Sequence, residues 1–199
     1  IRIAELALEA GFPAGVFNVV TGLGREAGAA LSGHPLVDYV TFTGSPLTGT
    51  AIQQAAAVNN RGVTMELGGK SPQIVFADAD LDKALPVLVN AIIQNGGQTC
   101  SAGSRILIEK PIYEKVAQAL ADRFSKLVAG PHDADLDLGP MINMKQRDRV
   151  AGYVDAAKDA GIPVLAEGRV KEDAPKGGYY HPPVLFGSVD PASALAREE

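Results

Sequence analysis

The sequence predicts an α/β protein with a parallel, Rossmann-like sheet, followed by part of a second α/β domain. Short apolar strand patterns alternate with helical patterns along the chain, which is typical of parallel βαβ units. Right-handed crossovers would place such strands in one sheet. The length of 199 residues and an apolar content of 46% allow a sizeable core in one or two domains.

The first third of the chain carries this alternation most clearly. A helical pattern ends at Gly11 and Pro13, because neither residue continues a helix well. The pattern after it predicts a buried strand at 16–20, a helix at 24–32, a strand at 37–42, a helix at 46–58 and a strand at 63–66.

The segment Gly44-Ser45-Pro46 joins a predicted strand to a predicted helix. Ser45 is a good N-cap and Pro46 suits the first helical position. The free amides and the positive dipole end of this helix would suit a pyrophosphate. The alternative is an ordinary capped helix without a ligand, because the segment lacks the GxGxxG fingerprint and the glycines of a P-loop.

The remaining residues continue the α/β pattern. Asp80 is expected to cap a helix that contains Pro86, a residue that predicts a kink or a late start. The predicted strands are 73–76, 105–109, 163–165 and 183–186, and the predicted helices are 81–94, one from about Pro111 to Val128, and 145–160.

Cys100 is the only cysteine, and it lies in the glycine-rich connection 95–105 between a helix and a strand. Gly96 and Gly97 would let another molecule approach the backbone closely. A nucleophilic thiol needs such access and a polar setting that favours the thiolate. The alternative is an inert filler, because free cysteines are often buried.

Glu66 begins the second candidate stretch, Glu66-Leu67-Gly68-Gly69-Lys70. A carboxylate at a glycine-rich strand end is a candidate general base. Its apolar and glycine neighbours predict a cleft, although a surface glutamate is the ordinary alternative. For Lys70, a structural ion pair or a surface role is expected.

Together these two stretches resemble the aldehyde dehydrogenase superfamily, in its NAD(P)-dependent, non-phosphorylating branch. The match covers the ELGGK motif at 66–70 and the GQxC motif at 97–100, with support from Phe42-Thr43-Gly44-Ser45 and Ala10–Val16. The resemblance implies Cys100 as nucleophile and Glu66 as base. It implies cofactor contacts, with NAD or NADP, at these positions: Gly22, Gly44, Ser45, Leu67, Gln146 and Glu199.

The resemblance also implies a domain organisation. Residues 1–69 are similar to the later part of the NAD(P)-binding domain, and residues 70–199 to the first part of the catalytic domain. The chain starts and stops inside the family pattern, so we expect a fragment of an oxidising enzyme that is inactive on its own. The alternatives are a semialdehyde-specific member of the superfamily and a non-catalytic fragment that binds a nucleotide or a partner.

Charge and composition limit the classes of partner and the location that the sequence predicts. The net charge of −5, with scattered acids and bases, shows no basic face for nucleic acid. No apolar run reaches the length of a membrane span. A single cysteine suits a reducing compartment, so a cytoplasmic location is expected. His34, His132 and His181 lie in separate loop-like contexts, which predicts no metal site. The expected partners are a small aldehyde and further copies of the parent in a dimer or tetramer.

Overall fold

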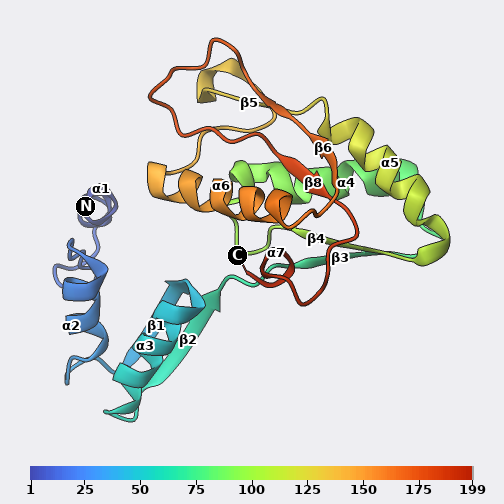
Figure 1. The fold of residues 1–199 in the computed structure, drawn as a ribbon. Helices are drawn as coiled ribbons and strands as arrows, with labels where there is room; N and C mark the ends of the chain where they lie inside the picture. Colours follow the sequence, from blue (N-terminus) through green and yellow to red (C-terminus); the bar gives the residue numbers. More distant parts are fainter. Residues whose placement is uncertain (199) are drawn as a thin grey trace. The chain divides into compact units, whose positions relative to one another are not determined.

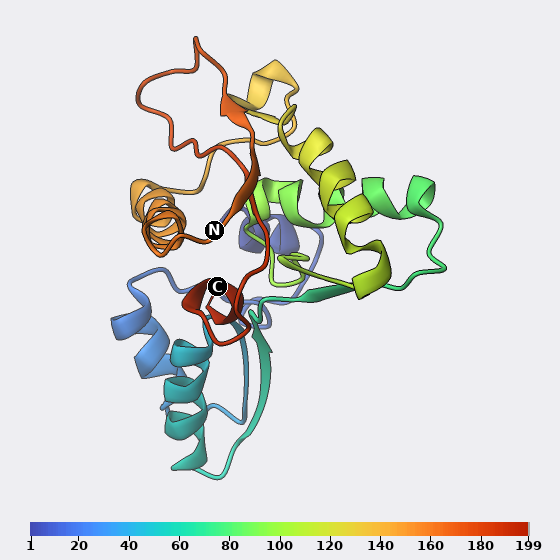
Figure 2. The same ribbon diagram turned by 45° about the vertical axis from the view of Figure 1, so that its right-hand side comes forward.

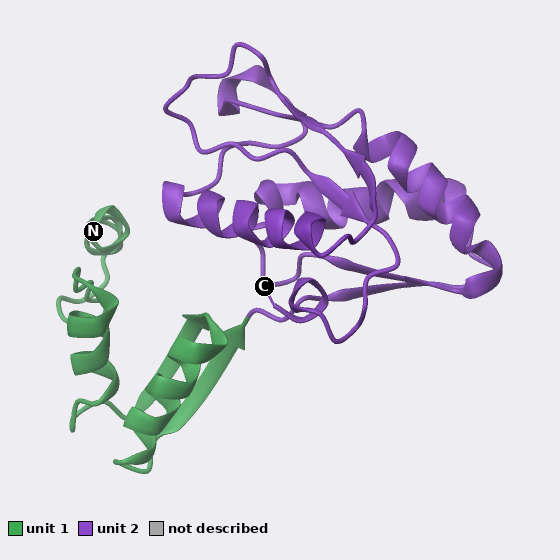
Figure 3. Cartoon of the chain, in the orientation of Figure 1, with its two compact units in different colours: residues 1–67 green, residues 68–199 purple. Residues whose placement is uncertain are grey.

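The structure is a computed structural model that describes residues 1–198 (Figures 1 and 2). The chain divides into two compact units, residues 1–67 and 68–199 (Figure 3). The division falls two residues before the boundary predicted at 69/70. Both units mix helices with strands, and three of the four strand pairs are parallel, which confirms the predicted α/β class.

The first unit contains one parallel strand pair with a helix against it. Its elements are α1 (Arg2–Glu9), the π-helical turn η1 (Gly24–Gly28), α2 (Ala29–Ser32), β1 (Tyr39–Gly44), α3 (Pro46–Ala57) and β2 (Gly62–Leu67). Helix α3 connects β1 to β2 and contacts both. Gly49 lets α3 approach β2, because a Cβ there would lie 2.8 Å from the Leu67 side chain.

The strand predicted at 16–20 is wrong. These residues have no strand conformation, and Val16 and Val20 are exposed. A strand needs a neighbour that pairs with its backbone, and within residues 1–67 the structure pairs only β1 with β2. The segment forms local turns instead: Val16 N donates to Pro13 O, and the Asn18 side chain donates to Gly15 O at 2.7 Å.

The second unit begins with a β–α–β arrangement. The connection between its helix and its second strand is the cysteine loop, residues 95–105. Strand β3 (Pro72–Val75) leads to α4 (Leu81–Ile93), the 3₁₀ turn η2 (Gln94–Gly97) and β4 (Arg105–Ile108), which pairs with β3 in parallel. Asp80 caps α4 as predicted, with its side chain accepting from Lys83 N at 3.3 Å. Pro86 lies inside α4, so the helix does not start late.

The rest of the second unit surrounds this arrangement. Its elements are η3 (Lys110–Ile112), α5 (Tyr113–Phe124), β5 (Val128–Ala129), η4 (His132–Ala134), α6 (Met144–Asp159), β6 (Val164–Glu167), β7 (Arg169–Val170), β8 (Val184–Phe186) and α7 (Ala194–Arg197). Strands β5 and β7 pair in parallel, whereas β6 and β8 pair antiparallel. Figures 1 and 2 both show β8 running between α5 and α6.

Helix α5 is shorter than the sequence predicted. The helix ends at Phe124, and Val128 and Ala129 form β5 rather than its last turn. The backbone groups of these two residues pair with β7, which lies about forty residues later in the chain. Pairing with a distant strand therefore overrides the local helical pattern, as tertiary context often does.

The core of the second unit lies between α4, α5 and the strands. It contains Val75 of β3, Leu85, Leu88 and Val89 of α4, and Val116, Leu120 and Phe124 of α5, with Leu127, Ala129 and Leu138 beside them. The two helices thus bury their apolar faces against each other and against β3. This core supports the connection that carries Cys100.

We expect Leu120→Ala to destabilise the second unit by about 2–5 kcal/mol. Leu120 is 2% exposed and packs in this core, so the shorter side chain leaves a cavity. Val87→Ala on the exposed face of α4 is the control, with a change within about 0.5 kcal/mol. Denaturant unfolding followed by circular dichroism measures both. Equal effects would contradict this description of the core.

Candidate active site

Cys100 lies on an exposed turn between α4 and β4. The turn begins with three residues in left-handed conformation: Asn95, Gly96 and Gly97 have φ of 52°, 63° and 77°. Glycine adopts this conformation without strain, and asparagine tolerates it better than most residues. The chain therefore turns sharply at the end of α4 and presents the thiol to solvent. The predicted polar, glycine-rich setting of Cys100 is confirmed, and its role as a nucleophile stays a prediction.

Gln73 of β3 holds the part of the cysteine loop that follows Cys100. Its Nε2 donates to Gly103 O at 2.8 Å and to Leu88 O at 3.2 Å. Gly103 is necessary for this approach, because a Cβ there would lie 2.5 Å from the Gln73 side chain. No role was predicted for Gln73 from the sequence, although a polar residue at the start of an apolar strand pattern was an available signal.

The residues that follow the ELGG motif are tied to the same loop within the second unit. Arg105 Nε donates to Lys70 O at 2.6 Å, and Ser71 Oγ donates to Cys100 O at 3.4 Å. The first bond has an ionised donor and is therefore the stronger of the two. Arg105 is the last residue of the connection 95–105, and no role was predicted for it from the sequence.

The first unit brings four of the predicted site residues together. In the β1–β2 register Thr43 lies opposite Glu66 and Gly44 opposite Leu67, and Ser45 follows directly as the N-cap of α3. All lie at the carboxyl ends of parallel strands, where α/β proteins commonly bind ligands. Gly22 lies in the loop before η1, outside this strand pair.

Within the first unit Glu66 is exposed, and the apolar neighbours from which a cleft was predicted do not enclose it there. The reason is the alternation of side chains along a strand. Val63, Met65 and Leu67 are partly buried, whereas the alternate residues of β2, including Glu66, are exposed. Apolar neighbours in sequence therefore belong to the opposite face of the strand and do not enclose the carboxylate.

The Ser45 cap is confirmed, because its Oγ accepts from Thr48 N at 3.3 Å. We expect Ser45→Ala to destabilise the first unit by about 1 kcal/mol through loss of this cap. Thr50→Ala on the same helix is the control. The Thr50 hydroxyl only donates back to Pro46 O, so its loss should cost nothing measurable. Thermal unfolding of both variants measures these changes in stability. A Ser45→Ala variant as stable as the wild type would contradict a stabilising cap.

A cavity of about 650 Å³ opens in the second unit beside the cysteine loop. Gly96, Gly97 and Ser104 of the loop line it, together with Gln146 of α6, which is the one predicted cofactor contact found there. Ser104 Oγ is buried without a hydrogen-bond partner. Cys100 is not among the lining residues, and Glu199 lies outside the described residues.

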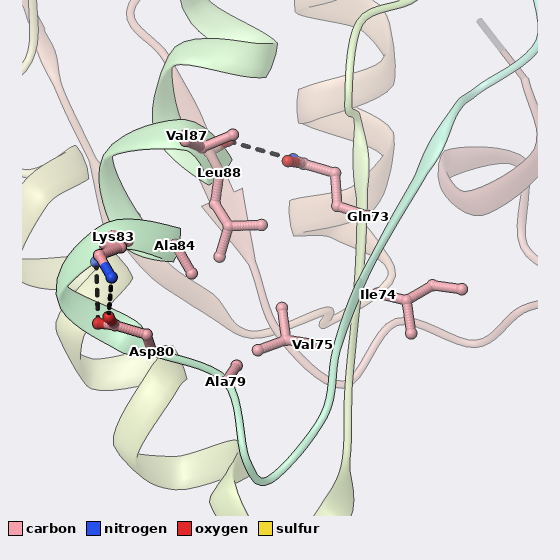
Figure 4. A pocket seen from close by; sticks show the side chains of 9 residues that line it. All are labelled: Gln73, Ile74, Val75, Ala79, Asp80, Lys83, Ala84, Val87 and Leu88. Atoms are coloured by element: carbon pink, nitrogen blue, oxygen red, sulfur yellow. Dashed lines mark hydrogen bonds and ion pairs between the residues drawn. The ribbon is translucent and has the colours of Figure 1, made fainter.

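A second hollow, shown in Figure 4, lies between β3 and the start of α4. Its polar side chains are already engaged: Gln73 reaches the backbone at Leu88, and Lys83 pairs with Asp80 at 2.9 Å. The hydrogen bonds from the Lys83 side chain and backbone hold the pKa of Asp80 below its usual value. Apolar side chains form the rest of the lining, so this hollow is not the candidate active site.

Neither a metal cluster nor a spanning helix is found in the described part of the chain. Across residues 1–198, His, Cys, Asp and Glu side chains form no group of three or more that could hold a metal ion. Over the same residues, no helix combines the length and apolar character needed to cross a bilayer.

The model of the aldehyde dehydrogenase family matches residues 1–199. The chain belongs to the aldehyde dehydrogenase family. An aldehyde dehydrogenase of Davidiella tassiana is 46% identical over 198 residues, covering 98% of this chain and 39% of that protein. A mitochondrial aldehyde dehydrogenase of Homo sapiens is 41% identical, covering 100% of this chain and 38% of the human protein.

Solved structures of aldehyde dehydrogenases share the fold. A crystal structure from Burkholderia cenocepacia, assigned to the aldehyde dehydrogenases, is 60% identical with a TM-score of 0.96, covering 100% of this chain and 42% of that one. Betaine aldehyde dehydrogenase of Staphylococcus aureus, solved in complex with NAD+, is 40% identical with a TM-score of 0.93, covering 100% and 40%. The chain spans about 40% of the length of these relatives.

Proposed function

We propose that this aldehyde dehydrogenase chain carries the nucleophile and the general base for NAD-dependent oxidation of an aldehyde to a carboxylate. The observation that carries the proposal is the exposure of the single cysteine on a fixed polar turn, in a chain of this family. Cys100 is the nucleophile and Glu66 is the base. Residues 1–69 belong to the cofactor domain and residues 70–199 to the catalytic domain.

The first step takes place at Cys100. Its thiolate attacks the carbonyl carbon, so a C–S bond forms and the carbonyl π pair moves to oxygen. The Cys100 backbone amide helps to hold the resulting oxyanion. When this carbon loses hydride, the thiohemiacetal becomes a thioester on the same sulfur. Covalent attachment divides one difficult oxidation into two easier steps.

The residues of the first unit fit the diphosphate of a dinucleotide. Gly44 and Ser45 are exposed at the N-terminus of α3, whose twelve residues give a helix dipole with its positive end at this site. Leu67 lies opposite Gly44 and would offer its backbone. Gln146, on the first turn of α6, and the predicted positions Gly22 and Glu199 complete the proposed contacts. NAD+, when bound, supplies the two-electron hydride acceptor.

Glu66 completes the reaction as a general base. It takes a proton from a water molecule, whose oxygen attacks the thioester carbon. The C–S bond then breaks, the carboxylate leaves and the Cys100 thiolate is restored. An exposed carboxylate at a strand end has the solvent access that this step requires.

NAD is favoured because neighbouring structures at 40% identity were solved in complex with NAD+. Small aldehydes are the proposed substrate class. A homo-oligomeric parent and a cytoplasmic location stay predictions, and some relatives are mitochondrial enzymes.

The test is a turnover assay on the protein expressed from its complete reading frame. We expect aldehyde-dependent NADH formation, with a smaller rate when NADP+ replaces NAD+. A panel of short aliphatic, aromatic, betaine and semialdehyde substrates separates the semialdehyde-specific alternative from the general one. Cofactor binding without turnover of any aldehyde would favour the non-catalytic alternative and contradict the proposal.

A further inference from the structure

The turn that precedes Cys100 contains a reciprocal pair of side-chain hydrogen bonds. Gln98 Nε2 donates to Asn95 O at 3.0 Å, and Asn95 Nδ2 donates to Gln98 O at 3.0 Å. The Gln98 backbone N–H also donates to Asn95 O at 3.2 Å. These bonds close the turn in which Asn95 holds its left-handed conformation.

Gln98 also joins this turn to a segment more than forty residues later. Its Oε1 accepts from Ile142 N at 3.0 Å. One partner of the Gln98 amide is thus a backbone donor and the other a backbone acceptor, which fixes the orientation of the amide group. The Ile142 side chain is 77% exposed, so the hydrogen bond rather than packing of this side chain makes the connection.

The segment around Ile142 is itself held on both sides. Met141 N donates to Tyr179 O at 2.8 Å, and Asn143 caps α6 by accepting from Gln146 N at 2.9 Å. Gln98 is therefore attached to an anchored part of the second unit. By contrast, the Cys100 carbonyl accepts only a longer bond of 3.4 Å from Ser71.

We propose that Gln98 is a positioning residue, which fixes the place of Cys100 through its hydrogen bond to Ile142. This inference rests on the proposed role of Cys100 as nucleophile. Gln98 acts on the sulfur indirectly, through its own backbone two positions before Cys100. A nucleophile displaced by about 1 Å can lose on the order of 100-fold in rate.

Three variants in the protein expressed from its complete reading frame test this role. Gln98→Met keeps the length of the side chain and removes the two hydrogen bonds of its amide group, to Asn95 O and from Ile142 N. Gln98→Glu keeps an acceptor for Ile142 N and loses the donor to Asn95 O. Gln118→Met is the matched control, because Gln118 on the exposed face of α5 bonds only Asp122. Amide hydrogen exchange at Ile142, steady-state kinetics and the rate of Cys100 alkylation by iodoacetamide are compared.

In Gln98→Met we expect the Ile142 amide to exchange at least about fivefold faster, because one hydrogen bond is lost. The kcat should fall about 10- to 100-fold while KM for NAD+ stays within about twofold. Alkylation of Cys100 should differ from wild type by at least about threefold. Gln98→Glu should restore the protection of Ile142 and recover most of kcat, and Gln118→Met should resemble wild type.

Two results would overturn the proposal. One is a Gln98→Met variant with faster exchange at Ile142 and with unchanged kcat and alkylation. The other is a Gln98→Glu variant that protects Ile142 and is as slow as Gln98→Met. If the wild type shows no aldehyde turnover, the proposed function fails. The alkylation rates then decide alone: rates that follow Ile142 protection support the positioning role, and equal rates reject it.

Discussion

In the protein expressed from its complete reading frame, replacing Cys100 with alanine should abolish aldehyde oxidation and leave cofactor binding intact. Without the sulfur no thiohemiacetal or thioester can form, so the covalent route is lost. Loss of a nucleophile typically lowers kcat by roughly four to six orders of magnitude. Calorimetry with NAD+ should give the wild-type affinity, because the proposed cofactor contacts lie on other residues. The measurements are NADH formation and calorimetric binding on the same preparation.

The control for this variant is Ser125→Ala, which removes a small polar atom at the end of α5. We expect full turnover from it. Cys100 is the only cysteine among these 199 residues, so thiol labelling should find no reactive cysteine within them in the variant. Near-normal turnover by Cys100→Ala would show that the assignment of the nucleophile is wrong.

Glu66→Gln should separate the two halves of the reaction. Hydride transfer does not need the base, so one equivalent of NADH should form rapidly. Hydrolysis of the thioester then limits turnover, and loss of a general base typically costs about a hundred- to ten-thousand-fold. Stopped-flow detection of NADH resolves the burst from the slow steady state.

Glu26→Gln is the matched control, because Glu26 is an exposed glutamate of the same unit that pairs only with Arg25. It should keep wild-type kinetics. A Glu66→Gln variant with neither burst nor slow phase would assign Glu66 to a step before hydride transfer. A variant with normal turnover would remove it from the mechanism.

Local chemistry explains the elements that the sequence predicted well. The caps at Ser45 and Asp80 depend on residues only three positions away, and both are confirmed. The helix–turn–strand setting of Cys100 also follows from neighbouring residues, because glycines permit left-handed angles without strain and asparagine tolerates them. The sequence therefore located the cysteine turn to within a few residues.

Distant contacts explain what the sequence could not predict. Val16–Val20 has a strand pattern, yet a strand also needs a pairing neighbour. Residues 128–129 leave a helical pattern because β7 pairs with them. Two of the attachments of the cysteine loop come from Gln73 and Ile142, which lie 27 and 42 residues from Cys100 in the sequence. No local pattern around Cys100 indicates either partner.

The most direct test of the mechanism is to detect the acyl group on Cys100. Glu66→Gln, expressed from the complete reading frame, is mixed with an aldehyde and NAD+, quenched in acid and digested. Mass spectrometry should show the peptide containing Cys100 heavier by the acyl group minus one hydrogen, and hydroxylamine should remove the addition. The adduct should be absent without NAD+. NADH formation with an unmodified Cys100 peptide, or the acyl group on another residue, would contradict the mechanism.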